Sequence, residues 1–123
     1  GALTMEDSLT FSAGSTNSVL IFGTAPGQYG SIIAAGPVDL GGAVLSINTD
    51  GYTVSEDGII WLLDNQGADP IGGTFLGLPD GSVVRSGKLA ARITYSADIG
   101  TAALSGGNDI AIIPISGSLI LFR

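Results

Sequence analysis

Three carboxylates flank the only tryptophan in the sequence, two before it and one after it. Glu56 and Asp57 precede the apolar run 59–63, which contains Trp61, and Asp64 follows it. Glycoside hydrolases use two carboxyl groups about 5 to 9.5 Å apart, and an indole ring can stack on a sugar. Solvated turns at strand ends are equally rich in such acids. We therefore expect no catalytic residues, and keep a carboxylate-dependent carbohydrate-active enzyme as an alternative.

Oxygen ligands for calcium are present but scattered. The run Gly106–Ile110 is similar to the β-roll nonapeptide, which binds calcium between successive repeats, but here it occurs once. We therefore expect Asn108 and Asp109 to form a turn before a strand at Ile110. Five further aspartates offer hard oxygen ligands: Asp39, Asp50, Asp57, Asp69 and Asp80. We expect no cofactor and no bound metal, with a structural calcium ion as the alternative.

The composition argues against several classes of partner and reaction. The chain of 123 residues has no histidine and no cysteine, which removes the commonest general base and the thiolate metal ligands. Its net charge of −7 leaves four cations against eleven carboxylates, so we expect no nucleic-acid partner. The longest apolar run, 110–122, contains Pro114 and Gly117 and is shorter than the roughly 18 residues of a membrane span.

Short apolar stretches alternate with turn residues along the whole chain. Leu9 and Phe11 fall on one face of a period-two pattern, which is typical of a half-buried strand. The run 59–63 is too short for a helix and predicts a strand buried on both faces. Further strands are expected at 18–22, 29–35, 38–40, 43–47, 75, 83–84, 89–95, 110–113 and 118–122. This predicts one all-β domain, 1–123, of about ten short strands, arranged either as a β-solenoid or as a β-sandwich or jelly roll.

Several segments together resemble secreted adhesin and autotransporter passenger proteins that carry autotransporter-associated β-strand repeats. The segments read APGQYGSII at 25–33, GPVDLGGAVL at 36–45, WLLDN at 61–65, GTFLGLPDG at 73–81, RITY at 92–95 and GNDI at 107–110. Gly30 stands where that family usually has aspartate. The resemblance implies a right-handed β-solenoid segment with a structural or adhesive role, located outside the cell or on its surface. The family has no shared active site to transfer to this chain.

The two ends of the chain suggest self-assembly. The segment 110–122 is very apolar for a terminus, and either it or the segment 3–11 could add as a strand to an exposed sheet edge of another copy. The alternative is that 110–122 closes the domain's own sheet, and residues 114–123 also resemble the start of a PEP-CTERM sorting tail. We expect a noncatalytic extracellular module whose partners are copies of itself, neighbouring solenoid segments or glycans. A carbohydrate-binding module using Trp61, Tyr29 or Tyr52 is the alternative function.

Overall fold

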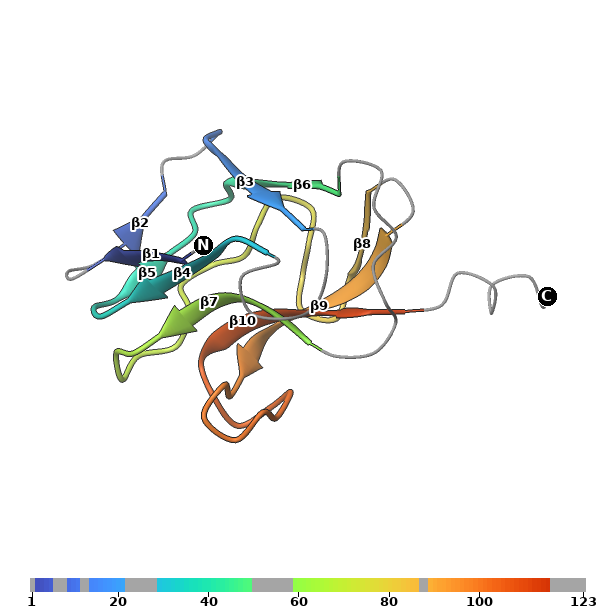
Figure 1. Ribbon diagram of the computed structural model, residues 1–123. Coiled ribbons are helices and arrows are strands. Elements are labelled where there is room, and N and C mark those ends of the chain that lie inside the picture. Colours follow the sequence, from blue (N-terminus) through green and yellow to red (C-terminus); the bar gives the residue numbers. More distant parts are fainter. Residues whose placement is uncertain are drawn as a thin grey trace.

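Ten short strands and no helix make up the described part of the chain (Figure 1). The computed structural model describes residues 2–5, 9–11, 14–21, 29–49, 59–86 and 89–115. The strands are β1 (Ala2–Met5), β2 (Leu9–Thr10), β3 (Thr16–Leu20), β4 (Ser31–Ala34), β5 (Val38–Asp39), β6 (Val44–Asn48), β7 (Ile60–Asn65), β8 (Val83–Ser86), β9 (Leu89–Ala97) and β10 (Asp109–Pro114). The predicted all-β class is therefore confirmed.

The first six strands form three parallel pairs with nearly the same sequence offset. β1 pairs with β4, β2 with β5, and β3 with β6. In each pair the partners are 28 or 29 positions apart, as shown by Ala2 with Ser31, Leu9 with Val38, and Thr16 with Val44. The chain thus makes two passes, β1 to β3 and then β4 to β6, and each strand of the second pass lies beside its counterpart in the first.

A third pass continues two of these pairs. β7 lies parallel to β4, with Ile32 opposite Leu63. Gly72 then forms a parallel bridge with Asp39, and its backbone exchanges two hydrogen bonds of 2.8 Å with β5 and the following residue. Beside the β3–β6 pair, the third pass makes a backbone bond from Leu76 N to Ala43 O at 2.8 Å, and no further strand pairs with β6 among the described residues.

The last three strands run antiparallel and complete a six-stranded sheet. Its order is β1-β4-β7-β10-β9-β8, so β10 lies between β7 and β9 and is paired on both sides. β8 pairs only with β9 and forms one edge of this sheet, and β1 forms the other. The sheet therefore changes from parallel to antiparallel pairing at the boundary between β7 and β10.

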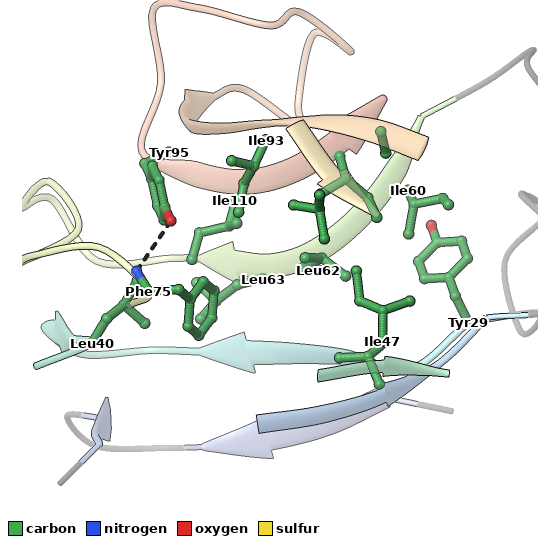
Figure 2. Close-up of a cluster of buried hydrophobic side chains, with 14 of the residues drawn as sticks. Tyr29, Leu40, Ile47, Ile60, Leu62, Leu63, Phe75, Ile93, Tyr95 and Ile110 are labelled. Carbon is green, nitrogen blue, oxygen red and sulfur yellow. Dashed lines mark hydrogen bonds between the residues drawn. The ribbon is translucent and has the colours of Figure 1, made fainter. Parts of the chain in front are cut away.

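The core lies between these layers and is built from stacked apolar side chains (Figure 2). Leu9 is in register with Val38, and Val19 with Ile47, and all four side chains are buried. Phe75 is fully buried, with ring centroids 6.4 Å from Phe11 and 6.3 Å from Tyr95. Burial of these side chains thus depends on contacts between segments that are distant in the sequence, and not on one strand pair alone.

Most predicted strands are present, with shifted ends. The buried strand predicted at 59–63 is β7, in which only Trp61 and Asp64 are partly exposed. Phe75 lies in an isolated bridge with Leu78 and not in a strand, because the chain turns back at once. The strand predicted at 118–122 lies outside the described residues. Among the described residues there is no helix long and apolar enough to cross a membrane.

Candidate functional site

Of the three carboxylates considered for the alternative of a carbohydrate-active enzyme, Asp64 is the one that lies among the described residues. Asp64 lies on β7 opposite Ile33 of β4, and Gln66 Nε2 donates to its Oδ2 at 3.5 Å. Burial raises the pKa of Asp64, the negative charge of Asp109 raises it further, and the Gln66 bond lowers it. Glu56 and Asp57 lie outside the described residues, so their position relative to Asp64 stays a prediction.

Asp109 is the acidic residue whose charge acts on Asp64, and both of its oxygens accept hydrogen bonds. It is 3% exposed; its Oδ1 accepts from Asn65 N at 2.7 Å and its Oδ2 from Ile99 N at 2.8 Å. These bonds join the end of β7 to the loop that follows β9. A buried carboxylate held in this way supports the fold.

Two of the five aspartates considered as calcium ligands hold backbone N–H groups. Asp39 Oδ1 accepts from Gly41 N at 3.0 Å, and Asp80 Oδ1 accepts from Tyr95 N at 2.9 Å. The side chain of Asp69 is exposed, and Asp50 and Asp57 lie outside the described residues. The described residues contain no group of three ionisable ligands that could hold a metal ion.

The aromatic candidates for sugar stacking differ in exposure. Tyr29 is only 8% exposed, which argues against the alternative that it serves as a platform for sugar stacking. A bridge between Tyr29 and Ile21 draws this part of the chain against the core. Trp61 is half-buried and packs against the same core, and Tyr52 lies outside the described residues.

Sequence reasoning did not identify a cluster of amide side chains around the turn 66–70. Asn65 is 4% exposed; its Nδ2 donates to Asp69 O at 2.9 Å and its Oδ1 accepts from Gly67 N at 3.0 Å. Asn108 Nδ2 donates to Gly67 O at 2.8 Å and to Asp69 O at 3.0 Å. Asn108 is 41 and 39 residues away in the sequence from the two carbonyl groups that it binds, so no local pattern predicts these bonds. The only sequence signal was that both asparagines stand at predicted turns. An open pocket beside this cluster is lined by Ala68, Pro70, Gly106, Gly107 and Asn108.

A second pocket lies between β3, β4 and β7. It is lined by Asn17, Ser18, Val19, Gly30, Ser31, Ile32 and Leu62. None of these described lining residues has an ionisable side chain, so the pocket has no group for acid–base chemistry.

The outer side of β3 is a distinct backbone feature. Val44 N donates to Ser15 O at 2.8 Å and Ile21 N donates to Asn48 O at 2.9 Å. In a parallel pair alternate residues direct both backbone groups to one neighbour, so residues 15, 17, 19 and 21 face β6, and Thr16 and Ser18 face the other way. No described strand pairs with that other side, just as β1 pairs only with β4.

The sequence matches no protein-family model, and comparisons with curated proteins and with solved structures find no match.

Proposed function

We propose that this chain is a noncatalytic structural or adhesive module of an extracellular or cell-surface protein, folded as a short β-solenoid that extends by strand addition at its first coil. The observation that carries the proposal is the set of three parallel pairs with nearly the same offset, in which β1, β2 and β3 have no second partner among the described residues.

The shared offset supports a solenoid over a β-sandwich. A sandwich is built mainly from antiparallel strands joined by hairpins and Greek-key connections. Here the first six strands pair in parallel with partners one full circuit away, and Gly72 adds a third layer next to Asp39. Parallel strands linked by crossovers are right-handed in nearly all proteins, which favours a right-handed coil. The antiparallel strands β8 to β10 then act as a cap on the last coil.

The direction of growth follows from the difference between the two sheet edges. β8 carries the exposed charge of Arg85, and charged side chains on a short edge strand discourage pairing with another chain. On the first coil, β1, β2 and β3 each pair on one side only among the described residues. A neighbouring solenoid segment or a second copy could therefore form backbone hydrogen bonds with β1, β2 and β3 at the same time.

The proposed location outside the cell rests on composition and on the family resemblance. The chain lacks cysteine, is strongly acidic and has few charged side chains for its length. An exterior of this kind keeps the module soluble through net repulsion, while pairing uses backbone groups that carry no charge.

Two proline variants in β3 test the assembly edge. Ser18→Pro removes an N–H that points away from β6, whereas Asn17→Pro removes one that points toward it. Both impose the same ring constraint on a strand, so they form a matched pair. We expect the unchanged chain to form large species at high concentration by size-exclusion chromatography and filaments by negative-stain microscopy. Ser18→Pro should reduce both and largely keep the free energy of unfolding, whereas Asn17→Pro should lower that free energy.

A clean monomer of the unchanged chain at high concentration would contradict self-assembly through this edge. Equal assembly by Ser18→Pro and the unchanged chain would place the contact elsewhere.

A further inference from the structure

The peptide bond between Asp69 and Pro70 is held in an unusual environment. It is the only Asp-Pro bond in the sequence. The carbonyl oxygen of Asp69 accepts two side-chain amide hydrogen bonds, from Asn65 Nδ2 at 2.9 Å and from Asn108 Nδ2 at 3.0 Å. Enzymes that cleave acyl bonds place two N–H donors at about this distance from the oxygen that becomes negative. The bond is therefore surrounded by the donors that an acyl-transfer reaction requires.

Both donors are fixed before any reaction begins. The amide of Asn65 cannot rotate freely, because its Oδ1 accepts from Gly67 N while its backbone N–H is bonded to Asp109. Asn108 is held by its second bond, to Gly67 O. The two asparagines come from the end of β7 and the residue before β10, which are adjacent in the sheet. Donors that need no reorganisation stabilise a developing charge most effectively.

The nucleophile is supplied by the same residue. The side-chain carboxyl of any aspartate can reach its own carbonyl carbon by closing a five-membered ring, which gives it a high effective concentration. The bond to proline is a tertiary amide with a weaker trans preference than other peptide bonds, and its nitrogen is a more basic leaving group than that of a secondary amide. These properties apply to Asp69 and Pro70 and to no other adjacent pair in the chain.

We propose that the folded chain cleaves itself between Asp69 and Pro70, with Asn65 and Asn108 as the oxyanion donors. A carboxyl oxygen of Asp69 bonds to the Asp69 carbonyl carbon, and the carbonyl oxygen becomes negative between the two amides. The C–N bond then breaks, and the carboxyl proton passes to the nitrogen of Pro70, which leaves as a secondary amine. Water opens the resulting cyclic anhydride and restores two carboxyl groups on Asp69.

The surroundings allow this water to enter. Asp69 and Pro70 are exposed, and the open pocket beside them is lined by Pro70 and Asn108. The titratable side chains on the two strands that supply the donors are Asp64 and Asp109; Asp64 is bonded to Gln66, and Asp109 to two backbone N–H groups. The proposed reaction uses the carboxyl group of Asp69 and requires neither Asp64 nor Asp109 as an acid or base.

The test compares the folded and the unfolded chain at one pH. The purified chain is incubated in mildly acidic buffer with and without urea, and intact mass is measured after denaturation, because β7 and β10 would keep the two fragments together. We expect fragments 1–69 and 70–123, formed at least about tenfold faster in the folded chain. Equal or slower cleavage in the folded chain would overturn the proposal, because it would show only the ordinary acid lability of an Asp-Pro bond.

Three variants separate the roles of the residues. Asp69→Ala should abolish cleavage, since the nucleophile is gone. Asn108→Ala should slow it by at least about tenfold, whereas Asn17→Ala, which removes an amide on β3, should leave the rate unchanged. Circular dichroism confirms that each variant is folded. An unchanged rate in folded Asn108→Ala would show that the donors do not act, and the urea comparison decides the matter if that variant unfolds.

Discussion

The hydroxyl of Tyr95 joins two parts of the loop around Phe75, and its removal gives a direct measure of how this buried contact stabilises the fold. It donates to Leu78 O at 2.7 Å. It also accepts from Phe75 N at 3.1 Å, the bond drawn as a dashed line in Figure 2. Tyr95→Phe keeps the ring and its contact with Phe75 but leaves both backbone groups without this partner. A buried polar group without a partner costs about 1 to 3 kcal/mol. Because Leu78 O is only part-buried, we expect a loss of about 2 to 3 kcal/mol in the free energy of unfolding.

Urea unfolding followed by far-UV circular dichroism measures this loss. The matched control is Thr94→Val, which also replaces a hydroxyl on β9. The Thr94 hydroxyl is exposed, and its bonds to Leu104 O and from Ser96 N are both 3.3 Å. We expect the control to change the unfolding free energy by less than about 0.5 kcal/mol. If Tyr95→Phe cost no more than Thr94→Val, the argument that this hydroxyl supports the loop would be refuted.

The same hydroxyl has a pH signature. Burial raises the pKa of Tyr95, the bond from the Phe75 backbone lowers it, and the charge of Asp80 raises it, with burial the largest effect. The neutral form is thus favoured in the folded state. Its contribution is complete below the unfolded value of 10.0 and is lost as the pH rises through the folded value. Tyr95→Phe should therefore show a smaller alkaline loss of stability than the unchanged chain.

Two further predictions concern the loop network beside β7 and β10. Burial, and then the charge of Asp109, raise the pKa of Asp64, so ionisation of Asp64 weakens folding as the pH rises through its folded pKa. Asp64→Asn should therefore raise the melting temperature at neutral pH and leave it nearly unchanged below pH 3.8, the ordinary value. A lower melting temperature at neutral pH would contradict this. Gly107→Ala should cost about 1 to 3 kcal/mol in urea unfolding, because a Cβ there would meet Ala97 O and the backbone of Asp98. Gly30→Ala is its control, with only Val19 Cγ1 at 3.8 Å from the added carbon, and an equal cost in both variants would refute the steric argument.

The local elements of this fold could be predicted because their signals are local. The alternation around Leu9 and Phe11 correctly predicts which side chains face inward, and the apolar run at 59–63 correctly predicts a buried strand. Several glycines in predicted turns adopt left-handed backbone, as Gly81 does at φ +87°. Each of these features depends on residues within one turn or one strand.

The pairing of the strands could not be predicted in the same way. In the three parallel pairs of the first six strands the partners lie 28 or 29 residues apart, and only Ser18 with Ser46 joins identical residues. Buried pairs such as Leu9 with Val38 require only that both members be apolar and of similar size, so no repeated motif marks the pairing. The cluster of Asn65, Asn108 and Asp109 was missed for a related reason, because its members meet only after the sheet has formed.

The sequence leaves two interpretations open for the strongly apolar segment that begins at Ile110: a strand added to another copy, or a strand of the domain's own sheet. Over 109–114 the structure supports the second, because Ile110, Ala111 and Ile112 are fully buried and β10 is paired on both sides. The segment is apolar because it lies inside the sheet, between β7 and β9, where pairing changes from parallel to antiparallel. Strand addition to 109–114 is therefore disfavoured, and the described edges of this sheet are β1 and β8.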